Sequence, residues 1–393
     1  MSISARERFL GICRFERPGD LCLLTPIINW FWPQTRKEWV KQGAPNEILQ
    51  DLSHFRGDCF QFDHCRLLEG VRTGLYVHSM DIGGGITYEL AIPPIVPTYE
   101  SRLIEEDDRT IILINDGGQK SRVLKDNPGK MPMFLDWPVK DRDSWKEYKK
   151  RLDPDTPERW PSDWNAYVQE ANSRDEPTML AVGSFFGFLR EWMGLERLLY
   201  TFYDDPSLIE DMMDQICYLE TECIKRVVKD IRVDFVWIFE DMAYKTGPLI
   251  SPDMVRKFMM PRYKKITDVL HSSGIDVMWL DCDGNANELI PLWLECGINF
   301  HWPLECAAGM DAVALRKKYG KDIILGGNID KRALSKGKDA IREEVMSKVP
   351  FLLESGGYFP SVDHVVPPDV TWEDYRYFIN TLREVAGLEK LPK

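Results

Sequence analysis

Short apolar runs alternate along this chain with longer stretches in which apolar residues recur every three or four positions. Such short runs are typical of buried strands, and the three-to-four spacing is typical of amphipathic helices. Eight runs predict strands, at 21–28, 59–62, 178–183, 234–239, 275–280, 298–302, 322–327 and 357–362. Strands that alternate with helices in this way predict an α/β fold, a parallel (β/α)8 TIM barrel.

Capping residues mark the ends of several predicted helices. The stretch 251–274 opens with Ser251 and Pro252, which favour the first turn of a helix, and it stops at Gly274. The stretch 205–230 opens in the same way, with Asp205 and Pro206. These signals predict long helices with defined ends between the strands.

The segment at about 83–130 follows a different pattern. Its polar and apolar residues alternate, with turn signals between them, which predicts antiparallel strands. We therefore expect a β-rich insertion between the early barrel strands, covering the barrel mouth. No repeat or low-complexity segment interrupts the rest, so residues 1–393 are expected to form a single barrel domain.

Composition and charge exclude some classes of function. The 393 residues include 50 Lys and Arg against 63 Asp and Glu, a formal charge of −13 without a basic run. Phosphate backbones repel such a protein, so nucleic acid is not an expected partner. No apolar stretch is long enough to span a bilayer, and the nine cysteines form no CxxC pair. We expect a soluble, cytoplasmic protein with free thiols and no membrane partner.

In a (β/α)8 barrel the active site lies at the carboxyl ends of the strands, where the loops converge. Ionisable residues follow six of the eight predicted strands, and polar or aromatic residues follow the other two. In chain order these residues are Asn29, Trp30 and Trp32; Asp63 and His64; Ser184 and Phe185; Glu240 and Asp241; Asp281, Cys282 and Asp283; His301 and Glu305; Asn328 and Asp330; and Asp363 and His364. Three of the six histidines fall at these ends, which favours an active site there.

Two chemistries fit a mouth rich in carboxylates. The first uses a divalent metal. Mixed His, Cys and Asp ligands favour zinc, whereas an all-oxygen set favours magnesium or manganese. Its candidate ligands are Asp281, Cys282, Asp283 and Asp363. The second is acid–base catalysis without a metal, in which crowded carboxylates raise one another's pKa. Its candidate residues are Glu240, Asp241, His301 and His364.

Three stretches carry a family likeness. They are ARERFLGICRFERPGDLCLLTP at 5–26, GPLISPDMVRKFMMPRYKKI at 247–266 and GGYFPSVDHVVPPDVTWEDYRYFI at 356–379. They resemble the opening, the segment after the fourth strand, and the last strand and loop of uroporphyrinogen decarboxylase-like proteins. The resemblance implies a TIM barrel, independently of the hydrophobic pattern, and a homodimer, an assembly often found in that family.

The superfamily that these stretches resemble contains two enzyme classes. Uroporphyrinogen decarboxylases carry an arginine-rich RQAGR loop after the first strand, where this chain has NWFWPQTRKEW at 29–39. The other class comprises methyltransferases that exchange methyl groups with a corrinoid on a separate protein, and its best-known members bind zinc through an HxC motif and a later cysteine. The corresponding positions here are occupied by Asp281 and Asp283, and by Asp363 and His364.

The resemblance therefore implies a methyltransferase that moves a methyl group from a small substrate to a corrinoid carried by a partner protein. Oxygen donors in place of thiolates suit an oxygen-bound methyl group, as in a methoxylated aromatic compound. The residues expected to bind this substrate, the aromatic ones by stacking, are Trp30, Trp32, Phe185, Trp302 and Glu305.

Other interpretations stay open. A decarboxylase, or another lyase, acting on a smaller carboxylated substrate is the second hypothesis, and a barrel that binds a ligand or docks a corrinoid without catalysis is the third. Structural roles are open too. Asp283 is favourable near a helix N-terminus by itself, and a buried Cys282 packs as a small apolar residue.

Overall fold

The structure is a computed structural model that describes residues 3–25, 31–49, 58–68, 71–73, 76–81, 87–92, 94–126 and 131–392. Trp30, one of the predicted substrate-binding residues, lies outside the described residues. Within the described ranges, no helix is both long enough and apolar enough to cross a membrane.

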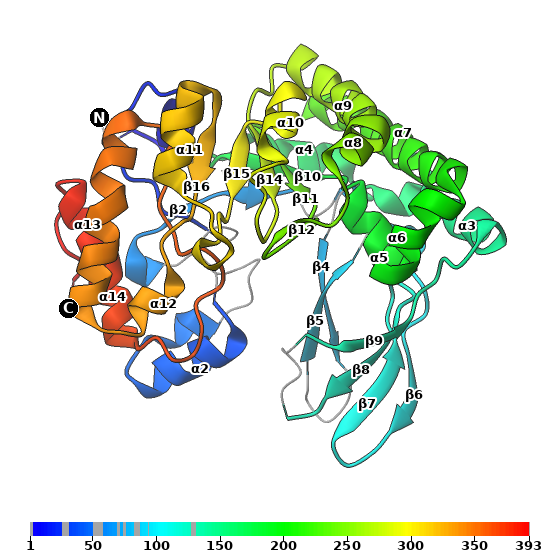
Figure 1. Cartoon of the computed structure of the whole chain (residues 1–393), viewed down its shortest axis with the longest axis horizontal. Helices are drawn as coiled ribbons and strands as arrows, with labels where there is room; N and C mark the ends of the chain where they lie inside the picture. The colour runs from blue at the N-terminus through cyan, green and yellow to red at the C-terminus, as the bar shows by residue number, and fades with distance from the viewer. Residues whose placement is uncertain are drawn as a thin grey trace.

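The centre of the fold is a curved parallel sheet (Figure 1). Its seven strands lie in the order β17-β16-β15-β14-β11-β10-β3, and β1 and β2 form a separate parallel pair. These strands are β1 Leu24–Thr25, β2 Asp63–His64, β3 Arg66–Leu67, β10 Thr178–Val182, β11 Phe235–Phe239, β14 Met278–Asp281, β15 Phe300–Trp302, β16 Ile324–Gly326 and β17 Tyr358–Phe359. The sheet is consistent with a TIM-like fold. Among the described residues one parallel bridge, Phe31 to Val366, joins the segments after β1 and β17, and no strand pair closes the ring.

Helices alternate with the parallel strands, as the sequence predicts. They are α1 Ala5–Cys13, α2 Pro33–Lys41, α3 Arg142–Lys149, α4 Trp164–Asn172, α5 Phe186–Met193, α6 Leu195–Asp204, α7 Pro206–Asp230, α8 Pro252–Met254, α9 Met260–Ser272, α10 Ile290–Glu295, α11 Ala312–Tyr319, α12 Lys331–Leu334, α13 Lys338–Ser355 and α14 Trp372–Val385. Shorter turns are η1 Asn46–Leu49, η2 Asp58–Phe60, η3 Pro157–Arg159, η5 Cys306–Ala308 and η6 Gly320–Asp322, with one π turn, η4 Val255–Met259.

Two elements differ from the prediction. The helix expected over 251–274 is interrupted by η4, because Pro261 in the first turn of α9 has no N–H to donate to the preceding turn. The apolar run at 59–62 overlaps η2, and the parallel strands β2 and β3 follow it. The ring of Phe60 lies 4.9 Å from that of Phe62 and 5.1 Å from that of Tyr375, so aromatic packing outside the sheet accounts for this run.

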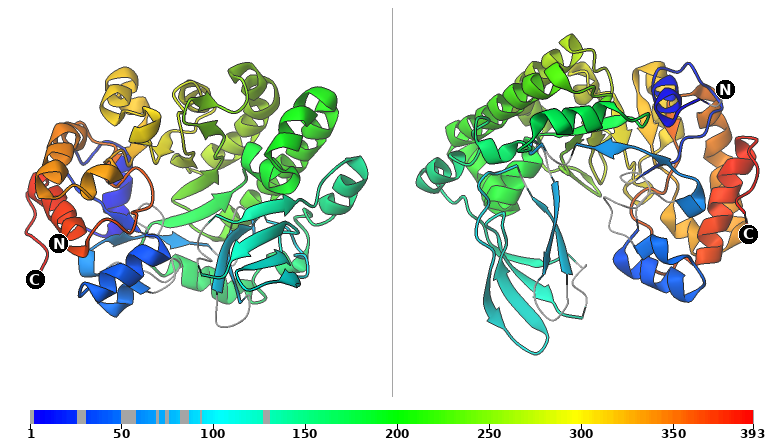
Figure 2. Two further views of the ribbon diagram at one scale, coloured as in Figure 1. Left: turned by 60° about the horizontal axis from the view of Figure 1, so that its bottom comes forward. Right: turned by 180° about the vertical axis from the view of Figure 1, so that it is seen from behind.

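The antiparallel strands project from one side of the parallel sheet (Figures 1 and 2). They are β4 Tyr76–Asp81 with β5 Thr87–Ile92, and the sheet β6 Arg102–Glu106, β7 Thr110–Ile114, β8 Lys120–Leu124 and β9 Met133–Asp136. A separate small hairpin, β12 Ala243–Tyr244 with β13 Gly247–Pro248, follows β11. The predicted insertion is thus supported in part, and its strands reach beyond 83–130 in both directions. Gln119 ties the sheet to α5, since its Nε2 donates to the Glu191 carbonyl at 2.9 Å.

The parallel sheet separates two apolar clusters. The inner cluster lies on its concave side, where Phe9 of α1 contacts Phe235 at 4.6 Å and Trp279 stacks on Phe300 at 5.4 Å between ring centroids. The outer cluster fills the space between the strands and the surrounding helices. Side chains alternate between the two faces of a strand, so neighbouring residues contribute to different clusters.

Candidate functional site

The carboxyl end of β14 places Asp281 on the inner face of the sheet. Trp279, two residues earlier, belongs to the inner cluster, so alternation puts Asp281 on the same side. The strand register sets it beside Phe239 of β11 and Trp302 of β15. Trp237 Nε1 donates a hydrogen bond to Asp281 Oδ2 at 3.3 Å. The result is a carboxyl group surrounded by aromatic rings.

Burial raises the pKa of Asp281 well above its usual value, and the charges of Asp283 and Asp241 act in the same direction. Asp283 carries its own partner, because His364 Nε2 lies 3.1 Å from Asp283 Oδ2. Burial alone would lower the pKa of His364, but the hydrogen bond and charge of Asp283 outweigh it and raise that pKa. The Asp283 side chain is 36% exposed and the His364 side chain 25% exposed, which leaves this pair accessible to a ligand.

Asp241 forms the second charged pair at this edge. Arg190 of α5 donates to Asp241 Oδ2 at 2.5 Å and to its carbonyl oxygen at 2.9 Å. Asp241 has a φ of 42°, in the left-handed region that non-glycine residues seldom adopt. Strained backbone of this kind persists where surrounding contacts hold it, and it concentrates at functional sites.

The turn after β14 depends on Gly284, whose φ is 79°. A Cβ atom at this position would lie 2.5 Å from the carbonyl oxygen of Ala243, so a larger residue would push the β12 hairpin away. Gly284 N–H donates to Glu305 Oε2 at 2.9 Å, and Lys331 Nζ lies 3.7 Å from Glu305 Oε1. Glu305 thus joins the loops after β14, β15 and β16.

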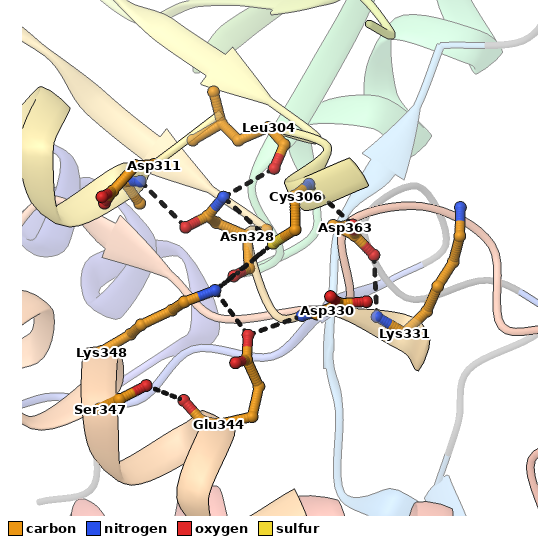
Figure 3. Close-up of polar contacts among 12 residues, drawn as sticks. Leu304, Cys306, Asp311, Asn328, Asp330, Lys331, Glu344, Ser347, Lys348 and Asp363 are labelled. Carbon is orange, nitrogen blue, oxygen red and sulfur yellow. Dashed lines mark hydrogen bonds and ion pairs between the residues drawn. The ribbon is translucent and has the colours of Figure 1, made fainter. Parts of the chain in front are cut away.

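Two predicted acidic residues are instead held by buried hydrogen bonds. Glu240 is fully buried and accepts from Ser184 Oγ at 3.0 Å and from the backbone N–H groups of residues 185, 186 and 187 at 2.9 to 3.1 Å. Burial nevertheless raises its pKa to about 7. Asp363 accepts from the N–H groups of Cys306 and Lys331, each at 2.9 Å (Figure 3). Both carboxyl groups hold loops together rather than face the mouth.

Three further predicted residues lie in the outer cluster, behind the sheet. His301 is 2% exposed and stacks on Trp293 at 5.6 Å, and burial lowers its pKa to about 3. Cys282 Sγ accepts from the N–H of Met242 at 3.4 Å, and burial raises its pKa. Phe185 packs edge-on against a tyrosine of α9 and is fully buried. The structure therefore does not bring them together with Asp281 and His364.

The remaining predicted aromatic residues occupy different surroundings. Trp302 is part of the inner cluster, and its Nε1 donates to Ser361 Oγ at 3.3 Å. Trp32 precedes α2 and is 37% exposed. Trp237 and Phe239, the two rings of β11 next to Asp281, are only partly buried, and the guanidinium of Arg190 lies over the Phe239 ring at 5.9 Å from its centroid.

A metal does not fit the predicted ligands as they lie. Cys282 points to the far side of the sheet, and the carboxylate oxygens of Asp363 accept from backbone N–H groups. Within the described residues, no three His, Cys, Asp or Glu side chains are grouped so that they could hold an ion. The metal stays a prediction, which elemental analysis of the purified protein and of an Asp283→Ala variant would test.

Sequence reasoning missed three residues of this edge. The apolar run at 234–239 places Trp237 inside a strand, and its two-residue spacing from Phe235 is the signal that it shares the inner face. Arg190 lies in the first helix after β10, and Lys331 begins α12, so neither directly follows a strand. Their positions depend on contacts with Asp241 and Glu305 that are distant in sequence.

The fold and the polar edge together define an α/β protein of the TIM-like class with a candidate site at the carboxyl ends of its strands. The sequence model of the family described as uroporphyrinogen decarboxylase (URO-D) matches residues 130–385, which is more than half of the chain. This chain belongs to the uroporphyrinogen decarboxylase family.

Individual relatives are distant. A uroporphyrinogen decarboxylase of Legionella pneumophila (strain Paris) is 23% identical over 205 residues, 51% of this chain and 54% of that protein. One from Hordeum vulgare is 21% identical over 244 residues, 57% of this chain and 69% of that protein. The chain thus spans about half the length of the Legionella relatives that it matches.

A solved structure is similar over nearly the whole chain. A methyltransferase from Methanosarcina mazei superposes with a TM-score of 0.55 at 14% sequence identity, covering 98% of this chain and 99% of that one. At this level of identity the likeness concerns the fold. The similarity in fold therefore includes residues that lie outside the 130–385 match to the family.

Proposed function

We propose that this protein is a methyltransferase that moves a methyl group from a small substrate, such as a methoxylated aromatic compound, to a corrinoid carried by a partner protein. The observation that carries the proposal is the charge of the candidate site. Its cations Arg190, Lys331 and His364 each lie beside an acidic partner, Asp241, Glu305 and Asp283 respectively, and burial favours the neutral form of Asp281. Because these three cations are already paired, they offer little attraction to a polyanionic porphyrinogen, and the edge accepts an uncharged methyl donor.

The ring faces beside Asp281 support an aromatic substrate. Trp237 is partly exposed and packs against the inner cluster, so a flat ring can stack on it while its oxygen points toward the carboxyl group. Phe185 and Trp302, which the sequence suggested for stacking, are buried in the protein. We therefore assign the stacking role to Trp237.

The Asp283–His364 pair supports the chemistry. When a methyl group leaves an ether, the electron pair of the C–O bond stays on oxygen, which then needs a proton. A reduced corrinoid on the partner protein supplies the nucleophile that accepts the methyl group. His364 is partly exposed at this edge, and Asp283 favours its protonated form, so His364 is our candidate for the proton donor.

Decarboxylation, the activity named in the Legionella and Hordeum relatives, is the second candidate. It is favoured by the family match over 130–385, and the same imidazole would then deliver a proton to the carbanion left by carbon dioxide. The cations at the site are already paired with carboxylates, which weighs against a substrate with several carboxylates. A small carboxylated compound is the form of this hypothesis that the charges allow.

Methyl transfer can be tested with free reduced cobalamin as the acceptor and a panel of methoxylated benzenes as donors. We expect methylcobalamin to form, and we expect His364→Asn to slow its formation by about 100-fold, the order of a general acid's contribution. His271→Asn is the matched control, because His271 lies 3.1 Å from Asp276 in an exposed pair away from the site. Release of carbon dioxide from a carboxylated substrate, without methylcobalamin from any donor, would establish the second candidate instead.

A further inference from the structure

Cys306 lies in contact with an amine. It begins η5, in the loop after β15, and its Sγ is 3.4 Å from Nζ of Lys348, which belongs to α13 (Figure 3). Both side chains are partly exposed, so a small oxidant reaches them from solvent. The other cysteines have no comparable lysine contact among the hydrogen bonds of the described chain.

The two reacting atoms are held in place from both sides. Lys348 Nζ donates to Glu344 Oε1 at 2.5 Å and to the carbonyl oxygen of Asn328 at 2.8 Å. The Cys306 thiol donates to the same Asn328 carbonyl at 3.4 Å, and its backbone N–H donates to Asp363. The flexible four-carbon stem of lysine allows the short remaining approach without a change in the backbone.

We propose that Cys306 and Lys348 form an oxidative modification site, in which a peroxide leads to a covalent sulfur–nitrogen bond between Sγ and Nζ. Hydrogen peroxide first converts the thiol to a sulfenic acid and is itself reduced to water. Sulfenic acids condense with nearby nitrogen to give sulfenamides. Glu344 accepts one proton from the ammonium group of Lys348, and the resulting amine attacks sulfur. The S–O bond breaks, and the hydroxyl group leaves as water with a second proton from the nitrogen, which keeps its third proton in the sulfenamide.

The cross-link would join a loop of the candidate site to an outer helix. The N–H of Cys306 holds Asp363, which directly precedes His364 in the loop after β17. Glu305, the residue before Cys306, accepts from Gly284 in the loop after β14. A covalent bond at Cys306 therefore restrains the loops that set the positions of His364 and Asp283, and it connects the redox state of the surroundings to the site.

Cys59 provides an internal control. Cys59 and Cys306 are the two cysteines that are not fully buried. The main cause, burial, raises the pKa of both thiols to about 12, and both side chains are partly exposed. Cys59 faces the Glu47 carboxylate instead of an amine. A difference between their oxidation products therefore reports the neighbouring Lys348.

The test is peptide mapping by mass spectrometry after the full-length protein is treated with hydrogen peroxide in excess. We expect the peptides of Cys306 and Lys348 to be joined with the loss of two hydrogen atoms, trypsin cleavage after Lys348 to be lost, and a thiol reductant to restore both peptides. Cys59 should remain a thiol or carry added oxygen atoms, in a peptide that is not joined to another. Lys348→Arg, which keeps the charge but removes the primary amine, should abolish the link.

The wild-type map alone can overturn the proposal. If Cys306 gives the same unlinked products as Cys59, or stays a thiol while Cys59 is oxidised, the amine contact has no chemical role. A linked product that persists in Lys348→Arg would place the bond at another nitrogen and would equally contradict it. None of these outcomes depends on methyl transfer, so the result is independent of the proposed function.

Discussion

At the scale of single residues, the three consecutive side chains after Leu280 have unrelated surroundings. Asp281 lies among aromatic rings, Cys282 packs behind the sheet, and Asp283 reaches the loop after β17 to contact His364. Each environment changes the pKa of a group through burial or through a charged partner, as for Asp281 and His364. The chemistry of residues 281–283 therefore depends more on the direction in which each side chain faces than on which residue types are present.

Asp283→Asn should lower the pKa of His364. The variant removes the carboxylate that favours the charged imidazole. Burial and the charge of Lys331, which disfavour that form, are then opposed by the weaker effect of Glu305. An NMR titration of the histidine ring protons measures the change. Asp276→Asn, at the exposed pair with His271, should leave the pKa of His364 unaltered. An unchanged pKa in Asp283→Asn would mean that the 3.1 Å contact does not set the charge of His364.

Glu240→Gln should destabilise the protein by about 1–3 kcal/mol. The buried Glu240 carboxyl group accepts four hydrogen bonds, and the glutamine amide would turn an NH2 group toward some of those donors. The folded-state pKa of Glu240, about 7, lies above its usual 4.5. A group whose pKa is raised by folding stabilises the folded state at pH values below its unfolded-state pKa. This stabilisation is lost as the pH rises through the folded-state pKa. Urea unfolding should show a difference between wild type and variant that shrinks from pH 4.5 to about 7. A difference that is constant with pH would refute the titration.

At the scale of elements, α1 covers the amino-terminal end of the inner cluster. Phe9 contacts Phe235 and Phe359 with ring centroids 4.6 and 5.3 Å apart. Phe9→Ala should lower the free energy of unfolding by about 3–5 kcal/mol, the usual effect of truncating a buried phenylalanine. Leu10→Ala, at the next, partly buried position of the same helix, should have a smaller effect in the same denaturation experiment. Equal losses would show that Phe9 has no special place in the core.

Gln119, directly before β8, links the sheet β6–β9 to α5. Gln119 is 5% exposed and donates to the carbonyl oxygen and to the carboxylate of Glu191 in α5, at 2.9 and 2.6 Å. Gln119→Ala should speed amide hydrogen exchange in β6–β9 and leave β10, β11 and β14 unchanged, because local opening needs only the local contacts. Faster exchange throughout the parallel sheet would instead indicate global destabilisation.

The order of the elements was largely predictable, since buried parallel strands are short apolar runs that local patterns reveal. The exceptions have local causes that a pattern does not report, such as the missing N–H of Pro261 and the aromatic contacts of Phe60. Site residues were less predictable. A strand end identifies a position, but His301 and Asp281 face opposite sides of the sheet. Partners such as Arg190 come from distant segments, which only the fold brings near.

At the scale of the whole molecule, buried acidic groups shift the stability toward mildly acidic pH. Burial raises the pKa of Glu220, Glu240, Asp281 and Asp363, so the folded state binds protons more tightly there than the unfolded state does. The stability that these four groups contribute is lost as the pH rises through their folded-state pKa values. We expect thermal unfolding to have a higher midpoint at about pH 5.5 than at about pH 8. A midpoint that rises over this interval would contradict the assignment.

The separation of the inner and outer clusters by one sheet has a consequence for the evolution of this chain. At the end of β14 and in its turn, Asp281 and Asp283 line the candidate site, whereas Leu280 and Cys282 pack behind the sheet. Selection for a new substrate would therefore change positions 281 and 283 and conserve the two apolar positions that support folding. A mutational library that varies Asp281 and Asp283 while fixing Trp279, Leu280 and Cys282 would sample specificity with little loss of folded protein, because Trp279 is fully buried in the inner cluster.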